Sequence, residues 1–251
     1  HQLSANSDIW QEHCEDICLE LGVDIICKTV SIKNRGTGIE DAAREARYGI
    51  FEKLLKKNDL LILAHHADDQ IETMLFRLFR GSGIKGMSGM PISRLLGNGE
   101  LFRPLLPFFR RDLESYALAN QINWIEDDSN LDVAFDRNFI RHKLIPTINE
   151  RWPNSSFQLN RSANIFAESD FLINVLAQKD FAILTEVSER VGWSISIDKL
   201  NRFEIIRQKN ILRYWFNLHN LTLPSYAVLD NALDQMIDSK ADAEPIVSWG
   251  D

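Results

Sequence analysis

Apolar residues in the first quarter of the chain alternate between helical spacing and short continuous runs. They recur every three or four residues in NSDIWQEHCEDICLELG, between a capping Ser7 and a terminating Gly22, which predicts an amphipathic helix. The same spacing predicts a second helix over residues 39–57. The runs VDIICKTV at 23–30 and LLILA at 60–64 are short and apolar, which predicts two buried strands.

Helix, strand, helix, strand and helix in this order, with nearly continuous apolar strands, is typical of a parallel sheet covered on both faces. Functional sites in such sheets lie at the carboxyl ends of the strands. His65 and His66 directly follow the second predicted strand, and the next helix is expected to start at Asp68 or Asp69. We therefore expect the chemistry of this chain at that strand end.

The rest of the chain predicts more helix than strand. ELFRPLL at 100–106 and WSISIDKL at 193–200 have the pattern of strands, and the final residues 241–251 look like another. Helical spacing recurs in five further segments, namely 110–122, 137–153 on both sides of Pro146, 155–189, 203–220 and 225–237. These elements predict a first domain over 1–153, a connecting helix or helices over 154–189, and a small, mainly α-helical second domain over 190–251 that binds substrate and is incomplete at its C-terminal end.

Composition excludes several classes of protein. A chain of 251 residues with 45% hydrophobic content can bury a substantial core, and none of its apolar runs is long enough to cross a bilayer. The three cysteines do not form a Cys-x-x-Cys pair, which favours buried thiols in a reducing compartment. We expect a cytoplasmic protein with no membrane partner. The net charge of -8 is unusual for a nucleic-acid binder, although basic residues gather near Arg103 and Arg141.

His65, Asp69 and Glu72 are the first candidates for catalysis. Asp69 and Glu72 are three residues apart on a helix and share one face, beside the strand end that carries His65. Simple capping by Asp68 and Asp69 is the competing interpretation, but it does not account for two histidines and a glutamate. A structural metal is disfavoured because no second group of ligands exists, whereas a transient Mg²⁺ on Asp69, accompanying a nucleotide, fits better.

Three further segments could contact phosphates or a base. RGSGIKG at 80–86 offers backbone N–H groups at Gly81 and Gly83, without the residue order of a P-loop. Arg44 and Arg47 lie three apart on the second helix, where a solvated charged face is the favoured alternative. Arg137 and Arg141 lie four apart, either as a phosphate clamp or in a salt-bridge network with nearby acidic residues, namely Asp127, Asp128, Asp132 and Asp136.

Taken together, GIEDAAREARY, LAHHADDQIETMLFRLFRGSGIKGMSGM, RPLL and WIEDDSNLDVAFDRNFIRHKLIP resemble the tRNA(Ile)-lysidine synthetase family of the PP-loop ATP pyrophosphatase superfamily. The resemblance covers residues 1–150 strongly and RFEIIRQKNILRYWF more weakly. It implies an α/β fold with a parallel-sheet PP-loop domain. It also implies ATP-dependent ligation of free L-lysine to C2 of the wobble cytidine of an isoleucine tRNA with a CAU anticodon, through an adenylated intermediate, with Mg²⁺ assisting.

The resemblance also implies roles for individual residues. His65, Asp69 and Glu72 match the strand-end motif of the family and would hold the cytosine, the lysine amine and a Mg²⁺-linked water. Arg44, Arg137 and Arg141 match its arginines and would face the anticodon nucleotide and the ATP phosphates. Four further residues are expected to contact substrate, namely Arg47, His66, Gly81 and Gly83.

One departure from the family pattern is the absence of the Ser-Gly-Gly-x-Asp-Ser loop that binds ATP. The chain also begins at His1 in mid-pattern, so we expect a fragment without a cofactor-binding loop, with weak or no ATP binding and no turnover alone. A thiolating enzyme of the same superfamily, a noncatalytic tRNA-binding module and a metal-dependent phosphohydrolase are the alternatives. The oligomeric state is left open, a homodimer included.

Overall fold

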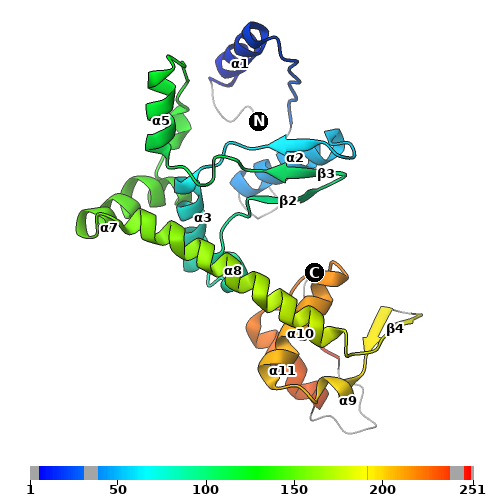
Figure 1. The fold of residues 1–251 in the computed structure, drawn as a ribbon. Coiled ribbons are helices and arrows are strands. Elements are labelled where there is room, and N and C mark those ends of the chain that lie inside the picture. Colours follow the sequence, from blue (N-terminus) through cyan, green and yellow to red (C-terminus); the bar gives the residue numbers. More distant parts are fainter. Residues whose placement is uncertain (1–5, 31–38, 191, 238–245, 250–251) are drawn as a thin grey trace. The chain divides into compact units, whose positions relative to one another are not determined.

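A computed structural model describes residues 6–30, 39–190, 192–237 and 246–249. The chain divides into two compact units, His1–Phe166 and Ala167–Asp251, which are considered separately below (Figure 1). None of the helices in the described ranges combines the length and apolarity needed to cross a membrane.

The first two helices of the first unit form where the apolar spacing predicts them. Helix α1 spans Ser7–Leu21 and ends at Gly22, whose left-handed backbone (φ 65°) closes the last turn, as expected. Ser7 is not the cap, because the helix begins at Ser7 itself and Asn6 occupies the capping position. Helix α2 spans Ile39–Leu54.

The strand predicted over residues 23–30 does not form. These residues have no regular secondary structure and are almost all exposed, including Val23 at 59% and Ile26 at 65%. A strand needs a hydrogen-bonded neighbour, and no described strand pairs with this segment. The apolar pattern alone was therefore insufficient to predict its structure.

The sheet of the first unit has three strands in the order β1-β3-β2. Strand β1 (Leu60–Ile62) runs parallel to β3 (Gly99–Phe102), while β2 (Ser93–Leu96) and β3 form an antiparallel hairpin. The predicted parallel sheet is present in part, since β1 and β3 pair in parallel while the segment between them contributes the antiparallel strand β2.

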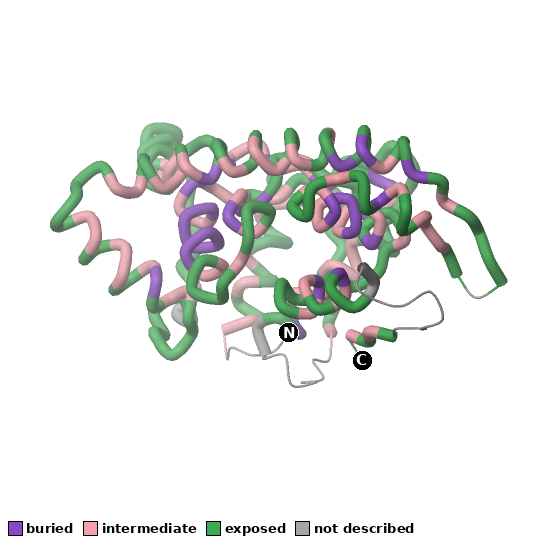
Figure 2. The backbone as a smooth tube through the Cα atoms, turned by 90° about the horizontal axis from the view of Figure 1, so that it is seen from below, coloured by how far each residue is buried: buried purple, intermediate pink, exposed green. Residues whose placement is uncertain are grey.

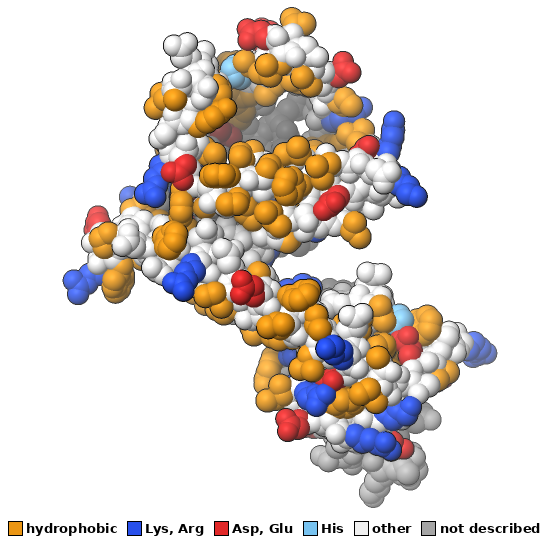
Figure 3. All heavy atoms as spheres, viewed as in Figure 1, with side chains coloured by type: hydrophobic (Ala, Val, Ile, Leu, Met, Phe, Trp, Pro, Cys, Tyr) orange, Lys and Arg blue, Asp and Glu red, His pale blue; other side chains and the backbone are white. Residues whose placement is uncertain are grey.

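The prediction that other elements cover both faces of the sheet is wrong. Leu60 and Ile62 of β1 are 52% and 60% exposed, and Leu95 of β2 is 81% exposed. Figure 3 shows hydrophobic side chains gathered over the sheet on the viewed face of this unit.

Helix α3 (Ala67–Phe79) is the most buried element of the first unit (Figure 2). Ile71 and Leu75 pack with Ile140, and Met74 packs with two residues further along the chain, Met87 and Ala163. The helix ends in a Schellman motif, in which Gly81 (φ 73°) and Ser82 donate to the carbonyls of Leu78 and Arg77, followed by the short helix α4 (Ile84–Met87).

Gln70 of α3 fixes the loop that follows α4. Its buried side-chain amide accepts from Met90 N at 2.6 Å and donates to Met90 O at 3.0 Å. Gly89 next to it has φ 67°, and a Cβ there would lie 2.5 Å from Gln70 Oε1.

We expect Gly89→Ala to destabilise the first unit by about 2 kcal/mol, because it adds a clash inside a packed core to an unfavourable backbone angle. The control is Gly81→Ala, which has a similar φ but open space around the new methyl group. Its cost should be limited to the backbone strain, about 1 kcal/mol. Urea unfolding of the two variants measures the difference, and equal losses would show that the contact with Gln70 is unimportant.

The remaining helices of the first unit carry the second half of the predicted site. Helix α5 spans Arg110–Ala119, and a 3-10 turn follows at Asp128–Leu131. Helix α6 (Asp136–Phe139), a π-helical turn (Ile140–Leu144) and helix α7 (Ile145–Arg151) then run on without a break. The wide turn agrees with Pro146, which has no N–H to bond the carbonyl of His142.

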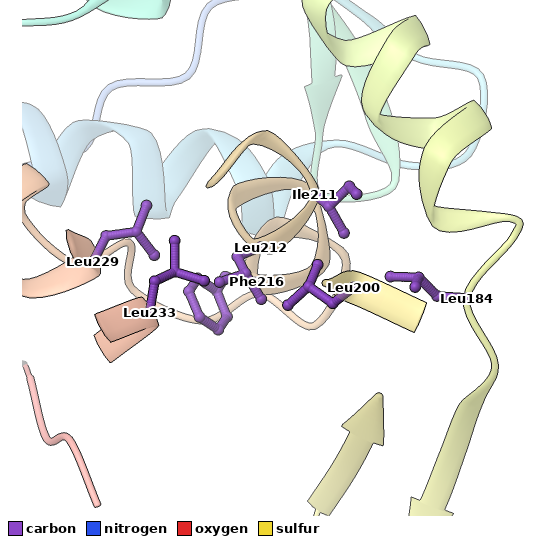
Figure 4. Packing of buried hydrophobic residues seen from close by; sticks show 7 residues of the cluster. All are labelled: Leu184, Leu200, Ile211, Leu212, Phe216, Leu229 and Leu233. Carbon is purple, nitrogen blue, oxygen red and sulfur yellow. The ribbon is translucent and has the colours of Figure 1, made fainter. Parts of the chain in front are cut away.

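Helix α8 (Ser155–Phe181) leads into the second unit, where β4 (Glu186–Glu189) and β5 (Gly192–Ile195) form a hairpin. Helices α9 (Ile197–Leu200), α10 (Ile205–Leu218) and α11 (Tyr226–Ile237) follow. Figure 4 shows apolar side chains of these helices converging with Leu184, which precedes β4, on one core, formed by Leu184, Leu200, Ile211, Leu212, Phe216, Leu229 and Leu233.

Three sequence predictions in this unit need correction. The helix expected to continue to residue 189 ends at Phe181, because residues 186–189 pair as β4. The strand expected over 193–200 stops at Ile195, since the Ser196 hydroxyl caps α9 by accepting from Lys199 N. In the predicted strand 241–251, residues 246–249 are irregular and the others lie outside the described residues.

Candidate active site at the carboxyl end of β1

The end of β1 leads directly into helix α3 through His65 and His66. His66 is the N-cap of α3, so the helix begins at Ala67, one residue before the predicted start. Asp69 caps it, with Oδ2 accepting from His66 N at 2.9 Å. Asp68 serves a different helix, because its Oδ2 accepts from Arg110 N at 2.7 Å, in the first turn of α5. Capping therefore accounts for one oxygen of each aspartate.

Glu72 and Arg141 form a buried, bidentate ion pair. Arg141 Nε donates to Glu72 Oε1 at 2.6 Å and Nη2 donates to Oε2 at 3.0 Å, while Nη2 also lies 3.3 Å from Asp69 Oδ1. The Glu72 residue is 3% exposed. Burial raises the pKa of the Glu72 carboxyl and Arg141 opposes that shift. The predicted carboxylates and one of the predicted arginines are thus brought together.

His66 faces two carboxylates. Its Nδ1 lies 3.4 Å from Asp68 Oδ2 and its Nε2 lies 3.5 Å from Asp69 Oδ2. Burial acts to lower the pKa of the His66 imidazole, but the negative charges of Asp68 and Asp69 outweigh it and the pKa is raised. His66 is therefore poised to hold a proton beside these aspartates.

His65 points into the opposite electrostatic environment. Burial lowers the pKa of its imidazole to about 4, and the positive charges of Arg103, Arg44 and Arg47 add to this effect against Asp69. Arg103 Nε donates to His65 Nδ1 at 3.3 Å, which leaves the ring proton on Nε2. At neutral pH the ring is uncharged and can donate a hydrogen bond from Nε2.

We expect the opposite pKa shifts of the two histidines to give opposite pH dependences of stability. Since the unfolded state binds the His65 proton more tightly, the stability that depends on His65 is present above pH 6.5 and is lost as the pH falls toward 4. The pKa shift of His65 corresponds to an upper limit of about 3 kcal/mol in the free energy of unfolding. The actual change should be smaller because the ring is partly exposed to solvent. His66 contributes stability below pH 6.5 that is lost as the pH rises.

Urea unfolding of His65→Gln and His66→Gln between pH 4 and pH 8 measures these slopes. The His65 variant should lose part of the rise in stability between about pH 4 and 6.5. The His66 variant should not show the part of the fall in stability at higher pH that is due to His66. The same change of slope in both variants would contradict the assignment.

A cluster of guanidinium groups surrounds Tyr48 and the end of β3. Arg44 and Arg103 both approach the Tyr48 hydroxyl, at 3.3 Å and 3.4 Å, and Arg44 also lies over the Tyr48 ring. Burial lowers the pKa of the Arg77 guanidinium, and the positive charges of Arg44, Arg137 and Arg103 lower it further. Like charges held this close favour the binding of an anion.

The structure distinguishes between the members of each predicted arginine pair. Arg44 lies half-buried against Tyr48, whereas Arg47 on the same helix is exposed. Arg141 is hydrogen-bonded to Glu72 and Asp69, whereas the Arg137 guanidinium lies 6.0 Å from the centre of the Phe76 ring, close to Arg77. Arg141 is thus bound by the carboxylates of Asp69 and Glu72, and Arg137 belongs to the guanidinium cluster.

The two predicted loop glycines have clear structural roles. Gly81 closes the Schellman motif after α3, and Gly83 is the N-cap of α4. A Cβ added at either position would meet no atom within 4 Å, so the backbone there is open to a ligand. A role of these glycines in substrate binding stays a prediction.

Sequence reasoning missed Tyr48, Arg77 and Arg103 as parts of this site. Arg103 is 2% exposed and directly follows β3, the strand parallel to β1. Residues after neighbouring parallel strands meet at one edge of a sheet, so the position of Arg103 in ELFRPLL was a usable signal. No comparable signal distinguishes Arg77, which donates to the carbonyls of Gly86 and Gly89.

Two family models match this chain. A family model described as a PP-loop domain matches residues 1–148, which include the strand end, the guanidinium cluster and Arg141. The chain belongs to the PP-loop family. A second model, described as a TilS substrate binding domain, matches residues 195–251, beyond this PP-loop domain.

Curated relatives of this PP-loop protein carry the name tRNA(Ile)-lysidine synthase. One from Legionella pneumophila (strain Lens) is 39% identical over 249 residues, which are 99% of this chain and 57% of the relative. Another from Coxiella burnetii is 39% identical over 250 residues, 99% of this chain and 55% of the relative. The predicted resemblance is therefore confirmed, and the chain spans a little over half the length of these relatives.

Proposed function

We propose that this chain forms the catalytic part of a tRNA(Ile)-lysidine synthase. The reaction would join free lysine to C2 of the wobble cytidine in a CAU-anticodon isoleucine tRNA, at the expense of ATP. The observation that carries this proposal is the convergence of Asp69, Glu72 and Arg141 with His65 and Arg44 at the end of β1. Similarity to lysidine synthases along nearly the whole chain supports it.

The guanidinium cluster suits the first half of the reaction. The cytosine O2 would attack the α-phosphate of ATP, and the bond to pyrophosphate would break. Negative charge on the transferring phosphate needs cations fixed in advance, and Arg44 and Arg137 are our assignments for that role. Neutral His65 would donate a hydrogen bond from Nε2 to the base or to a phosphate oxygen.

The carboxylates of Asp69 and Glu72 suit the second half of the reaction, the transfer of lysine. The ε-nitrogen of lysine would attack C2 of the adenylated cytosine, the bond from C2 to the oxygen of AMP would break, and AMP would leave. The nucleophile must first lose a proton, because an unperturbed lysine amine has a pKa of about 10.4. We assign proton acceptance to Asp69, whose side chain is 23% exposed, and the positioning of Arg141 to the buried Glu72.

Mg²⁺ fits this site only in a limited way. Within the part of the chain that the structure describes, no three His, Cys, Asp or Glu side chains converge on one metal position. Mg²⁺ bound with nucleotides usually takes one or two carboxylates and completes its shell with phosphates and water. Asp69 is our assignment for that carboxylate, and bound Mg²⁺ would withdraw charge from the phosphates.

The test uses a chimaera in which this chain replaces the matching region of the Legionella pneumophila relative. The purified chimaera is incubated with ATP, Mg²⁺, L-lysine and a CAU-anticodon isoleucine tRNA transcript, and the digested tRNA is analysed by mass spectrometry. We expect lysidine in place of the wobble cytidine, together with AMP and pyrophosphate. A folded chimaera that binds the tRNA but leaves the cytidine unmodified would contradict the proposal.

A further inference from the structure

Arg103, directly after β3, is a buried arginine without an acidic partner. The residue is 2% exposed, and no carboxylate in the described part of the chain forms a salt bridge with it. A buried charge is costly unless hydrogen bonds or an opposite charge compensate for its burial. Burial accordingly lowers the pKa of the Arg103 guanidinium. Hydrogen bonds to neutral groups must therefore hold this side chain in place.

Three neutral acceptors surround the guanidinium. Nη1 donates to the carbonyl oxygen of Pro91 at 2.7 Å, Nη2 donates to the Tyr48 hydroxyl at 3.4 Å, and Nε donates to His65 Nδ1 at 3.3 Å. The backbone is fixed as well, because Arg103 N donates to the carbonyl oxygen of Ile92 at 2.8 Å. Each nitrogen of the side chain thus has an acceptor within the protein. Arg103 is closed to solvent and is not placed to bind a phosphate directly.

The bond to Arg103 determines which nitrogen of His65 carries the proton. A neutral imidazole has one donor nitrogen and one acceptor nitrogen. A carboxylate beside Nδ1 holds the proton there and leaves Nε2 free to accept one, as in the Ser-His-Asp triad. A guanidinium can only donate, so beside Nδ1 it has the opposite effect and places the proton on Nε2. Among the described residues none is hydrogen-bonded to His65 Nε2, so this N–H can bind a ligand.

We propose that Arg103 is a positioning residue that makes His65 a hydrogen-bond donor instead of a general base, an inference that rests on the proposed function. The Nε2–H group of His65 would bind an acceptor atom of the reacting groups, on the base or on a phosphate. Tyr48 supports this arrangement, because its hydroxyl accepts from Arg103 and from Arg44. Arg103 thus acts through His65, whereas our assignment for Arg44 is the phosphate itself.

The ring nitrogens of His65 report its tautomer directly. The 251-residue chain is labelled with ¹⁵N-histidine, and NMR at pH 7.5 correlates the ring nitrogens with the carbon-bound ring protons. His65→Gln identifies the signals of His65 among the six histidines. We expect nearly all His65 rings of the unsubstituted chain to carry the proton on Nε2. A proton on Nδ1 would overturn the inference without the need for any further variant.

Arg103→Lys separates the hydrogen bond from the charge. Lysine keeps the positive charge but has a carbon atom in place of Nε, so His65 Nδ1 loses its donor. We expect the fraction of rings with the proton on Nδ1 to rise about tenfold, the usual effect of losing one charged hydrogen bond. Arg103→Met, which also removes the charge, should have the same effect. An unchanged ring in either variant, with the amide spectrum of a folded chain, would overturn the inference.

Arg94→Gln is the matched control for the charge. The Arg94 guanidinium lies 5.4 Å from the centre of the Tyr48 ring and its charge acts on Arg103, but its Nη1 donates to the carbonyl oxygen of Leu95 and not to His65. Removing this charge should leave the tautomer of His65 unchanged. The same change of tautomer in Arg94→Gln and Arg103→Lys would overturn the inference, because it would show that the hydrogen bond from Arg103 does not set the tautomer.

The activity of the chimaera tests whether Arg103 acts through His65. Arg103→Lys should lower kcat for adenylation, measured as pyrophosphate release, about tenfold, with little change in KM for ATP. In a chimaera that already carries His65→Gln, the same substitution should change kcat less than about twofold, because the effects of two residues that act together are not additive. Equal losses in the two backgrounds would overturn the inference.

Failure of this inference is distinguishable from failure of the proposed function. The NMR experiment measures the tautomer without substrate, so a proton on Nδ1 would overturn the inference even if the chimaera made lysidine. A chimaera that formed no lysidine would contradict the proposed function, whatever the tautomer of His65.

Discussion

Arg141→Gln is expected to destabilise the first unit by about 3 kcal/mol at neutral pH, the usual cost of leaving one member of a buried ion pair alone. Glu72, whose side chain is 4% exposed, would keep its charge without the bidentate partner that now compensates for its burial. Urea unfolding of the 251-residue chain measures the loss.

The pH dependence of this loss follows from the Glu72 pKa. In the native protein that pKa is raised, so the stability linked to Glu72 is present below its unfolded pKa and declines as the pH rises through the folded value. Removing Arg141 removes an interaction that lowers the pKa, so the decline extends to higher pH. The destabilisation caused by Arg141→Gln should therefore be smaller at pH 5 than at pH 7.5.

Two variants make the interpretation specific. The double variant Glu72→Gln/Arg141→Gln should recover about 2 kcal/mol, because no buried charge remains. Arg110→Gln breaks the Arg110–Glu114 pair, in which both side chains are nearly half-exposed, and should cost less than about 1 kcal/mol. A double variant no more stable than Arg141→Gln alone would show that the two charges are not coupled.

Arg44→Gln is expected to lower kcat/KM of the chimaera for lysidine formation by about 100-fold to 1000-fold, the range seen when one fixed donor to a developing negative charge is removed. Arg44 is held against the Tyr48 hydroxyl and ring, within a cluster of like charges that favours the binding of an anion. The loss should appear in kcat for the adenylation step, measured as pyrophosphate release.

Arg47→Gln is the matched control, since Arg47 lies three residues away on the same helix with an exposed side chain. It should change kcat/KM less than about threefold, as expected for a surface charge. Equal losses in the two variants would point to a general effect of positive charge instead of a specific role for Arg44.

The sequence predicted local structure well where the residues of a single segment determine its conformation. Gly22 ends α1 because the left-handed turn acts over a few residues, whereas the predicted cap Ser7 is the first helical residue and Asn6 is the N-cap. The position of His65 and Asp69 at a strand end also follows from the order of elements. In contrast, residues 23–30 have the composition of a strand but no hydrogen-bonding neighbour, a property that depends on distant residues.

The site itself was predicted only in part for the same reason. Arg141 and Glu72 are 69 positions apart, and periodicity left open whether Arg141 clamps a phosphate or joins a salt bridge. The structure shows the salt bridge, although with Glu72 and Asp69 instead of the nearby aspartates considered from the sequence. The pKa of His65 is lowered by burial and by Arg103, which lies 38 positions away and is connected to His65 by no local pattern. The pKa of His66 is raised against burial by Asp68 and Asp69, which are its neighbours in the sequence.

The central claim is that lysine is transferred to tRNA at the carboxyl end of β1. Incorporation of labelled lysine into the CAU-anticodon isoleucine tRNA by the chimaera, compared between Asp69→Asn and Asp68→Asn, tests it most directly. We predict ATP-dependent incorporation by the unsubstituted chimaera, a loss of about 100-fold or more in Asp69→Asn, and a much smaller change in Asp68→Asn, whose carboxylate caps α5. Undiminished incorporation by a folded Asp69→Asn chimaera would contradict the claim.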